Sequence, residues 1–574
     1  MRNFVALDDY RLNHKKPPEP ETVLGEKGIF TLKPDGVFYA AFSSDGQPQT
    51  ERRICSPLQV LGETRSVSSD SWGRMLEWKD GDGKTHKWAM PVELLAGDGL
   101  EVIRTLMSGG LHIATGKSKQ VVDYINTCKA VSRITCTNKT GWHGGAYVTS
   151  NTVYGEDAGE YVYQGSLINT AIGQRGTLAE WKGQVSACAA GNSRAVFAIS
   201  AAFAASLVRL AGIESGGFQY TGESKDGKTT VVKMAASVFG VPDDYKRLWR
   251  TTSNALEGTA LMHNDGFLIL DELKMCSSKE VGDVAYNLTN GQEKARSTKA
   301  GGMRELRTWK LLYFSTGEIS LPDYVASGGG KTFAGQEVRH ADIPSNAGTG
   351  FKVMDTIHGF KDLPAFFAHI NTTINRNYGT AGDAWLQRIA TDRASIEATI
   401  GDSLTTIKAE LLPDNSNTQH DVVATRFALV ALAGEMATQY GITGWNDGEA
   451  TGAAKRCFND WLEGFGAGNR EDTKILQAVT AFIERNGAKF QDLTLISPNA
   501  IPDLVGYSRM AASGREYLVL ASQFERICDG YSRKQVVPVL VAAGILQTAT
   551  SKPERIPDGV KKVYVLRLQD DSHE

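Results

Sequence analysis

A glycine-rich run at residues 222–229 carries the residue types that bind phosphate groups. It reads GESKDGKT and matches the pattern G-x-x-x-x-G-K-[ST] in full. Its glycines allow backbone angles that turn successive N–H groups toward phosphate oxygens. Lys228 is expected to bridge the β- and γ-phosphates of ATP, while Thr229 places its hydroxyl on Mg²⁺. The nucleotide-binding residues predicted from this run are Gly222, Glu223, Ser224, Gly227, Lys228, Thr229 and Thr230.

Two acidic residues end an apolar run further along the chain, at residues 267–272, which reads FLILDE. Asp271 is predicted to hold Mg²⁺ through water, and Glu272 to polarise the water that attacks the γ-phosphate. Many strands end in acidic turns, so this run is informative because a glycine-rich loop and a helix-forming stretch precede it. Together the two runs predict hydrolysis of ATP, with Lys228, Asp271 and Glu272 as catalytic residues and with Thr229 and Asp271 as Mg²⁺ ligands.

A polar pair follows a further apolar run at residues 309–314. In this class of nucleotide site, a polar side chain on the strand next to the acidic strand can sense the γ-phosphate. Ser315 or Thr316 would fill that role. The alternative is a plain turn at the end of a strand, and the sequence does not separate the two.

Strands and helices must alternate to position these residues. Residues 218–220 are predicted to form a strand before the loop, and residues 231–237 an apolar helix after it. Apolar strands at residues 267–270 and 309–314 follow, with helix-forming stretches between them, and this order is typical of a parallel α/β sheet. The predicted fold class is therefore α/β and multidomain, with a P-loop NTPase core.

Changes in sequence texture divide the chain into five parts. Short β-like runs give way to long helices with apolar strands, and then to Ala-rich helices. A helix at residues 532–543, then residues 544–547 and a closing strand at 563–568, has the pattern of a winged helix. Arg533 and Lys534 leave open whether this unit binds DNA or protein. We predict a flexible leader at residues 1–24, a mainly β domain at 25–165, the ATPase core at 166–370, a helical lid at 371–488 and a winged-helix-like domain at 489–574.

Composition argues against several classes of protein. The 574 residues are too many for one hydrophobic core, and the net charge of −3 gives no global attraction to DNA or to an anionic membrane. The seven cysteines include no C-x-x-C pair, which argues against a zinc ribbon and a disulfide framework and favours a reducing compartment. The most apolar stretch, residues 196–208, is shorter than the roughly 18–20 residues that span a bilayer. We therefore expect a cytoplasmic protein without a membrane partner.

Several segments beyond the glycine-rich run resemble one family. They are Gly141-Trp142-His143, residues 222–229, 249–258, 268–272, 290–296 and 315–318, and Val338-Arg339. Over roughly residues 28–490 the chain resembles the domain of unknown function 927 family, found in replication proteins of phages, plasmids and genomic islands. The resemblance implies a branch of AAA+ helicases similar to MCM and superfamily III enzymes. It also implies a homo-oligomeric ring, usually a hexamer, with ATP bound between subunits.

The resemblance suggests roles for two arginines. Such rings need a positive side chain from the neighbouring subunit to stabilise charge in the transition state. Arg339, after the sensor strand, is the candidate for this finger, and an ordinary strand-end arginine in a surface pair is the alternative. Arg426, at the start of a helix in the predicted lid, is a candidate second sensor of the nucleotide. A solvated helix arginine is the alternative there.

Residues 294–309 read as a β-hairpin with a Gly-Gly tip and several basic residues. In MCM-like and superfamily III rings, the hairpin at this point projects into the central channel and grips DNA. A basic loop would supply locally the phosphate attraction that the net charge does not give. The alternative is a solvated hairpin whose charges keep it soluble. The predicted DNA-binding residues are Lys294, Arg296, Lys299 and Arg304.

These patterns favour an ATP-dependent, ring-forming DNA helicase of a phage or mobile genetic element that translocates on single-stranded DNA. The alternatives are a non-motor AAA+ switch, acting as an origin-binding initiator or regulator, and a catalytically weak structural scaffold, against which the intact Lys228 and acidic pair argue. The expected cofactors are ATP and Mg²⁺. The expected partners are single-stranded and forked DNA, further copies of the chain, and a separate primase or loader.

Overall fold

The computed structural model describes residues 21–130, 132–165, 169–294, 306–330, 332, 334–414, 416–465, 470–494, 501–511, 514–527, 531–556 and 559–567. The chain divides into two compact units. The first comprises Met1–Leu412 and Val422–Trp461, and the second comprises Pro413–Asp421 and Leu462–Glu574. Among the helices of the described residues, none has both the length and the apolar character that crossing a membrane requires.

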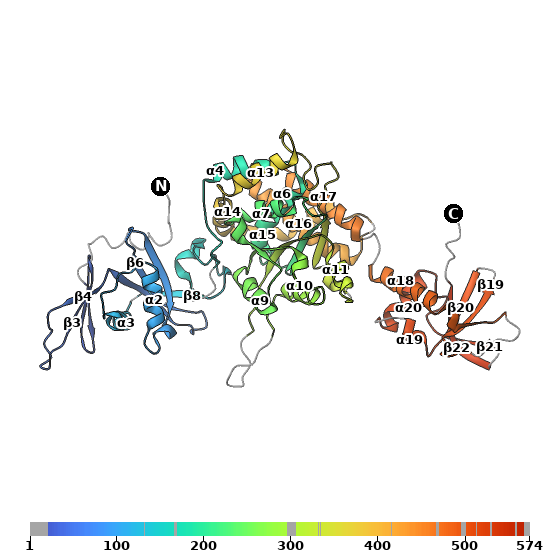
Figure 1. The fold of residues 1–574 in the computed structure, drawn as a ribbon, viewed down its shortest axis with the longest axis horizontal. Helices are drawn as coiled ribbons and strands as arrows, with labels where there is room; N and C mark the ends of the chain where they lie inside the picture. Colours follow the sequence, from blue (N-terminus) through green and yellow to red (C-terminus); the bar gives the residue numbers. More distant parts are fainter. Residues whose placement is uncertain are drawn as a thin grey trace. The chain divides into compact units, whose positions relative to one another are not determined.

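The described residues of the N-terminal part of the first unit form two β-sheets and two α-helices, drawn mostly in blue in Figure 1. One sheet has the order β1-β2-β3-β4 and the other β12-β8-β5-β6-β7. Helices α2 (Leu100–Ser108) and α3 (Ser118–Thr127) turn their apolar faces onto a core shared with Ile54 and Leu76. The strands are β1 (Glu21–Gly25), β2 (Gly28–Lys33), β3 (Gly36–Ala41), β4 (Arg52–Cys55), β5 (Leu58–Arg65), β6 (Gly73–Lys79), β7 (Thr85–Pro91), β8 (Arg133–Thr137) and β12 (Tyr161–Tyr163).

Strand β1 shortens the predicted leader. The leader was expected to reach residue 24, but β1 pairs antiparallel with β2, from Glu21 opposite Leu32 to Gly25 opposite Gly28. The hairpin is too short for its alternation to stand out beside the Pro- and Glu-rich residues before it. The rest of the predicted leader, residues 1–20, lies outside the described residues.

A small antiparallel sheet links this N-terminal part to the rest of the first unit. It consists of β9 (Gly141–His143), β10 (Ala146–Val148) and β11 (Val153–Tyr154). The indole of Trp142 donates to the carbonyl oxygen of Ser206 at 2.8 Å, and its backbone N–H donates to the carboxylate of Asp265 at 3.0 Å. Asp265 is fully buried and also pairs with Arg209 at 2.8 Å. Residues 141–143 are therefore hydrogen-bonded to Asp265, the residue that precedes strand β15.

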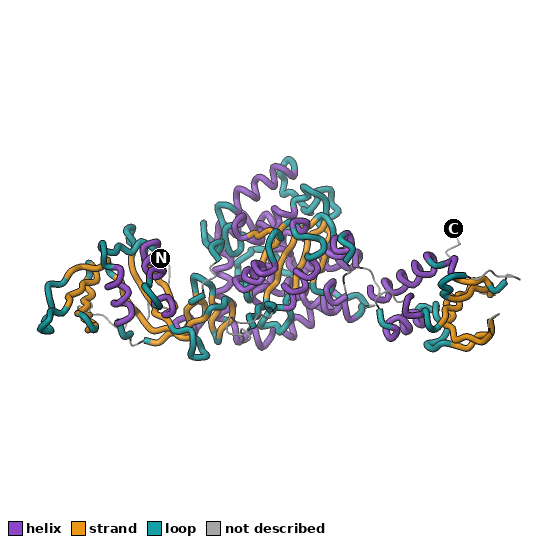
Figure 2. Tube along the Cα trace, turned by 60° about the horizontal axis from the view of Figure 1, so that its bottom comes forward, coloured by secondary structure: helices purple, strands orange, loops and turns teal. Residues whose placement is uncertain are grey.

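A five-stranded parallel sheet forms the centre of the first unit (Figures 1 and 2). Its order is β14-β15-β16-β13-β17, and every pairing in it is parallel, as the sequence predicted. Strands β15 and β16 are buried along almost their whole length, which explains their continuous apolar sequences. The strands are β13 (Gly216–Thr221), β14 (Lys246–Leu248), β15 (Gly266–Asp271), β16 (Leu311–Gly317) and β17 (His340–Pro344).

Helices pack around this sheet. Helix α6 (Ser193–Ala204) is buried on all sides, because its sequence is apolar around the whole helix, and it packs against α7 (Lys228–Ala236) and strands β15 and β16. Further helices of this region are α9 (Ser253–Met262), α10 (Val281–Asn290), α11 (Leu321–Ser327) and α12 (Ala334–Glu337). The helical region that follows contains α13 (Leu363–Ile374), α14 (Thr380–Thr391), α15 (Arg393–Leu411), α16 (Thr418–Gln439) and α17 (Glu449–Phe465).

The second unit begins earlier than the predicted boundary at residue 489. Helix α18 (Arg470–Arg485) buries Ile475 and Val479 against Val536 and Leu540 of helix α20, so it shares the core of this unit. Helix α20 (Arg533–Ala542) lies where the sequence predicted a helix. The sheet is five-stranded rather than a two-stranded ribbon, because β22 pairs with β20 and β21 along its length. Residues 544–547 meet β22 through one antiparallel bridge, between Leu546 and Leu566. Its order is β18 (Phe490–Asp492), β19 (Gly506–Ala511), β20 (Gly514–Leu520), β22 (Gly559–Arg567) and β21 (Lys552–Ile556).

Candidate nucleotide site

The glycine-rich run forms the loop between strand β13 and helix α7. Gly227 caps the helix with a φ of 96°, and Lys225 adopts a φ of 63°, a left-handed conformation that non-glycine residues rarely take. The ammonium group of Lys228 points back across the loop and donates to the carbonyl oxygens of Gly222 at 2.8 Å and Glu223 at 2.5 Å. Burial lowers the pKa of Lys228. The loop thus presents a helix N-terminus and a partly buried cation to the same space.

Two side chains of the segment that follows β17 hold the loop in shape. A Cβ atom on Gly222 would lie 2.0 Å from the hydroxyl oxygen of Ser345, so this close approach requires glycine. That hydroxyl donates to the buried carboxylate of Asp226 at 3.1 Å. The ammonium group of Lys352 donates to the carbonyl oxygen of Lys225 at 3.0 Å. The segment after β17 therefore braces the outside of the loop.

The brace is anchored by a buried arginine that the sequence patterns did not single out. The guanidinium of Arg194 is fully buried and donates to the carbonyl oxygens of Pro344 at 3.0 Å and Asn346 at 3.2 Å. It also pairs with Asp460 at 2.5 Å. No local sequence pattern predicts such a contact, because its partners lie far along the chain.

Three polar side chains contact Asp271 at the carboxyl end of β15. The hydroxyl of Thr229, on α7, lies 3.4 Å from one carboxylate oxygen, and the hydroxyl of Thr316, on β16, donates to the same oxygen. The ammonium of Lys246, on β14, lies 2.7 Å from the other oxygen. The structure therefore brings Thr229, Asp271 and Thr316 together, and it adds Lys246, which the sequence patterns did not indicate.

Glu272 is exposed at the edge of this cluster. Its backbone has a φ of 60°, and its N–H donates to the hydroxyl of Thr316 at 3.1 Å. The side chain is thus turned away from the strand and out of the protein core. An exposed carboxylate beside the glycine-rich loop is able to accept a proton from water.

The two candidates on β16 have different surroundings. The hydroxyl of Ser315 accepts a hydrogen bond from the indole of Trp249 at 2.9 Å and donates to the side-chain oxygen of Gln219 at 2.9 Å. Neighbouring residues of a strand face opposite sides of the sheet, so Ser315 and Thr316 cannot both reach Asp271. Thr316 is the polar residue at the site, and Ser315 belongs to a buried network beside it.

Arg339 and Arg426 lie at the opposite end of the sheet. Arg339 precedes β17, and its guanidinium pairs with Glu214 at 3.1 Å. The guanidinium of Arg426 packs on Gly216, the first residue of β13, whereas the glycine-rich loop follows the last residue of that strand. The six residues of β13 therefore separate both arginines from the loop of the same chain, by roughly 17 Å.

The surroundings of Arg426 contradict the solvated-arginine alternative and leave its role as a second sensor a prediction. It is buried, and burial lowers its pKa to about 10, so it is not a solvated helix arginine. It donates to the carbonyl oxygen of Val338 at 2.6 Å, at the far edge from the loop, so the structure does not bring it to the predicted nucleotide of its own chain. Arg426 lies beneath the amino end of β13 because of the way its helix docks on the sheet, and helix docking leaves no local sequence pattern.

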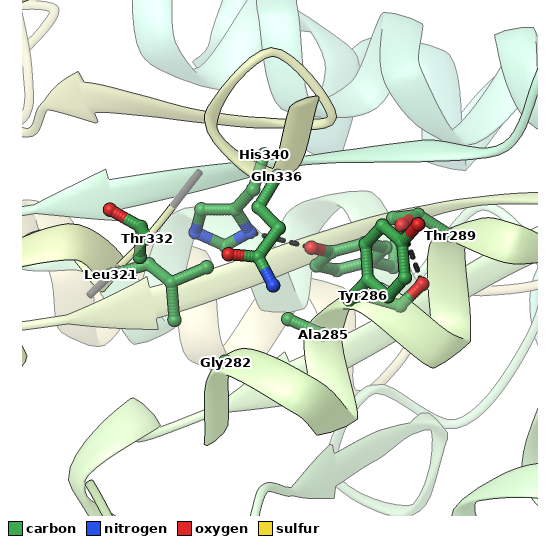
Figure 3. A pocket seen from close by; sticks show the side chains of 9 residues that line it. Gly282, Ala285, Tyr286, Thr289, Leu321, Thr332, Gln336 and His340 are labelled. Atoms are coloured by element: carbon green, nitrogen blue, oxygen red, sulfur yellow. Dashed lines mark hydrogen bonds between the residues drawn. The ribbon is translucent and has the colours of Figure 1, made fainter. Parts of the chain in front are cut away.

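The start of β17 beside Arg339 is firmly packed (Figure 3). The Nδ1 atom of His340 and the hydroxyl of Tyr313, on β16, form a hydrogen bond of 2.6 Å. A small cavity of about 10 Å³, lined by Tyr286, Gln336 and His340 among others, has room for about one water molecule. The guanidinium of Arg339 lies 5.7 Å from the ring centre of Tyr286. The packing around Tyr286 and His340 therefore holds the backbone at Arg339 in place.

The predicted DNA-binding residues fall mostly outside the described residues, namely Arg296, Lys299 and Arg304. The two ends of the segment are described. Gln292 and Thr308 form an antiparallel bridge, and Arg307 pairs with the buried Glu293 at 2.9 Å. The backbone N–H of Lys294 donates to the buried carboxylate of Glu257, on α9, at 3.3 Å. The ends of the predicted hairpin are thus held side by side by two buried glutamates.

The fold and the site define a multidomain α/β protein with a parallel sheet and a glycine-rich loop at the carboxyl end of its strand β13. Residues 30–308 match the model of the family described as domain of unknown function (DUF927), the family that the sequence predicted over roughly residues 28–490. A solved structure described as "SCCmec type IV Cch - active helicase" is similar over 97% of this chain and 98% of that chain, with a TM-score of 0.69 and 16% identity. At this identity the likeness concerns the fold. A search of curated proteins finds no match.

Proposed function

We propose that this protein is an ATP-dependent DNA helicase of a mobile genetic element, with an AAA+ ATPase core built on the parallel sheet. The convergence of Lys228, Thr229, Asp271 and Thr316 at the carboxyl ends of β13, β15 and β16 carries the proposal. These residues combine a cation for phosphate, a hydroxyl, a carboxylate and a sensing hydroxyl in one place. The structural neighbour described as an active helicase supports it through its fold.

The donor set of the site fits ATP with Mg²⁺. Within the described residues, no group of three or more His, Cys, Asp or Glu side chains forms a metal site of its own. Mg²⁺ is usually held by one or two carboxylates, substrate phosphates and water, and Thr229 with Asp271 offers that incomplete set. When bound with ATP, the ion would neutralise charge on the phosphates. Lys246 holds one oxygen of Asp271 and leaves the other facing Thr229.

Each of the site residues then has a definite role in hydrolysis. Lys228, held at present by two backbone carbonyls, would exchange them for β- and γ-phosphate oxygens. Glu272 would orient and polarise the attacking water. Thr316 would report the state of the γ-phosphate, because it touches both the Asp271 carboxylate and the backbone of Glu272.

Arg339 supports assembly into a ring. It lies roughly the length of β13 from the loop of its own chain, so a phosphate that it contacts must belong to another copy. We propose that Arg339 completes the site of the neighbouring subunit, in a homo-oligomer that is a hexamer by resemblance to MCM-like rings. Glu214, its partner in the single chain, is exposed and would release it.

DNA is proposed to pass the basic segment that includes Lys294, Arg296, Lys299 and Arg304. Buried glutamates hold the ends of this segment: Glu257, on α9, accepts from the backbone of Lys294, and Glu293 pairs with Arg307. In the second unit, which is proposed to be a winged-helix-like domain, Lys534 at the start of α20 is exposed and available to DNA or to a protein.

Two assays test the proposal and separate a motor from a non-motor switch. ATP hydrolysis is measured with and without single-stranded DNA, and strand displacement is measured on a forked duplex. We expect DNA to stimulate hydrolysis and ATP to drive displacement, both abolished in Lys228→Ala and both kept in Lys455→Ala, a change on the exposed face of α17. Hydrolysis that DNA does not stimulate, with no displacement, would favour the switch. No hydrolysis at all would contradict both.

A further inference from the structure

A second cavity lies at the amino end of the central sheet, opposite the glycine-rich loop. Its volume is about 310 Å³, at the lower end of the roughly 300–1,000 Å³ of ligand pockets. Its walls come from the residues before β13, the end of α10 and the residues that enter β16, including Ser215, Asn290, Thr308 and Lys310. The last two of these segments also carry the two ends of the predicted hairpin. The cavity is therefore at the root of that hairpin, and every residue that lines it is described.

Cationic side chains outnumber carboxylates around this cavity. Arg209, Lys310 and Arg339 line it, against the single carboxylate of Glu214. Each of the two arginines has a carboxylate partner. Lys310 is different, because its ammonium donates only to the carbonyl oxygen of Ile213, at 3.1 Å, and no carboxylate of the described residues is within ion-pair distance. A charge held only by a neutral oxygen gains most from an anionic partner.

A second lysine of this kind reaches the rim of the cavity. Lys139 lies in the loop between β8 and β9, and its ammonium donates to the hydroxyl of Thr308 at 3.3 Å. It is half-buried, and burial together with the nearby charge of Arg209 lowers the pKa of Lys139. As with Lys310, no carboxylate within the described part of the chain makes an ion pair with it. Lys310 thus lines the cavity, and Lys139, from a distant segment, hydrogen-bonds to Thr308, another residue of its lining.

We propose that this cavity is a phosphate-binding site in which Lys310 and Lys139 hold a backbone phosphate of DNA. Lysine ammonium groups with nearby hydroxyl and amide donors, here Thr308 and Asn290, are the groups that contact DNA phosphates without reading sequence. The phosphate chemistry rests on these residues alone, and the choice of DNA as its source rests on the proposed function. The site fixes the strand at the root of the hairpin, independently of contacts at its tip.

Salt dependence of DNA binding tests the site. Affinity for a labelled single strand is measured by fluorescence anisotropy across a salt series for Lys310→Gln, Lys139→Gln and the double variant. Each phosphate contact that a variant loses should reduce the slope of log affinity against log salt concentration by about 0.7. The ratio of wild-type to variant affinity should therefore shrink about 2.6-fold between about 50 and about 200 mM salt. Lys310→Arg keeps the charge and should keep the slope. Lys455→Gln, an exposed lysine on α17, should also leave it unchanged.

The outcomes separate the sources of phosphate. A double variant with wild-type slope and wild-type melting temperature overturns the proposal, and so does a Lys310→Arg variant whose slope falls as far as that of Lys310→Gln. Binding of a fluorescent non-hydrolysable ATP analogue, measured without DNA, should not change. Loss of analogue binding with unchanged DNA binding would assign the phosphate to a nucleotide and overturn the assignment to DNA. Absence of hydrolysis in the wild type, both with and without DNA, would contradict the proposed function, and the salt slopes would still test the phosphate site.

Discussion

The hydroxyl of Thr316, on strand β16, donates a hydrogen bond to the carboxylate of Asp271, on the neighbouring strand β15. We expect Thr316→Val to lower ATP hydrolysis on the order of 10- to 100-fold, because a hydrogen bond to a charged group contributes about 1.5–3 kcal/mol. Nucleotide binding should change little. The measurement is steady-state hydrolysis beside binding of a fluorescent ATP analogue.

Ser315→Ala is the matched control for that change. Its hydroxyl lies between Trp249 and Gln219 in a buried network, so its removal should reduce the free energy of unfolding by about 1–3 kcal/mol and leave the rate per folded molecule unchanged. A larger drop in hydrolysis in Ser315→Ala than in Thr316→Val would reverse the two assignments.

Substitutions of Lys228 and Glu272 should impair ATP hydrolysis in different ways. Lys228→Ala removes the charge proposed to contact the β- and γ-phosphates and should abolish hydrolysis while weakening nucleotide binding. Glu272→Gln removes only water activation, so ATP should stay bound while its hydrolysis falls by about 10²–10⁴-fold. Equilibrium binding and single-turnover hydrolysis distinguish the two variants. Wild-type hydrolysis by Glu272→Gln would remove that residue from the catalytic set.

Arg339 should act between copies of the chain. Hydrolysis by Arg339→Ala alone is expected to fall about 10³–10⁵-fold, as it does on removal of an arginine finger. Mixed with an excess of Lys228→Ala chains, it should recover some activity, since a mixed interface can pair an intact loop with an intact arginine. Co-assembly is verified first by size-exclusion chromatography. If no ratio of the two variants restores hydrolysis, a role for Arg339 in trans is contradicted.

His263 gives the fold a dependence on pH. It is fully buried, with its ring between the carbonyl oxygen of Thr259 and the side chain of Asn169, and burial lowers its pKa to about 4. The unfolded chain takes up a proton near the ordinary histidine pKa of about 6.5, whereas the folded chain does not until about pH 4. Stability is therefore complete above about pH 6.5 and falls as the pH drops toward 4, by roughly 2–3 kcal/mol.

Urea unfolding at several pH values measures this effect. His263→Gln should flatten the dependence between pH 6.5 and 4, even if the variant is less stable throughout. An unchanged pH dependence in that variant would assign the acid sensitivity to other groups.

The glycine-rich loop, the acidic strand and the parallel sheet are predictable from sequence because each depends on local patterns. A phosphate loop needs glycines at fixed spacing, and a strand buried on both faces needs a continuous apolar run. The sequence leaves the choice between Ser315 and Thr316 open, because it depends on which face of β16 meets Asp271, and pairing with β15 decides that. Sequence pattern indicates a strand but not the direction of each side chain.

Residues that reach the site across long chain separations are not predictable in this way. Lys246 contacts Asp271 from the short strand β14, and Arg194 and Lys352 brace the loop from distant segments. The burial of Arg426 depends on a helix that docks beneath Gly216, where the absence of a side chain makes room. The early start of the second unit follows from the core that α18 shares with α20, which composition does not reveal.

The separation of Arg339 from the glycine-rich loop of its own chain by the length of β13 has a kinetic consequence. Under the proposed role of Arg339, the chain carries the two halves of a catalytic site at opposite ends of its sheet and is enzymatically incomplete when alone. Turnover per molecule should then rise with protein concentration and fall on dilution, and any partner that covers the amino edge of the sheet would silence the enzyme without touching its nucleotide. The cell could thus set the activity of this protein through its copy number, before any DNA is present.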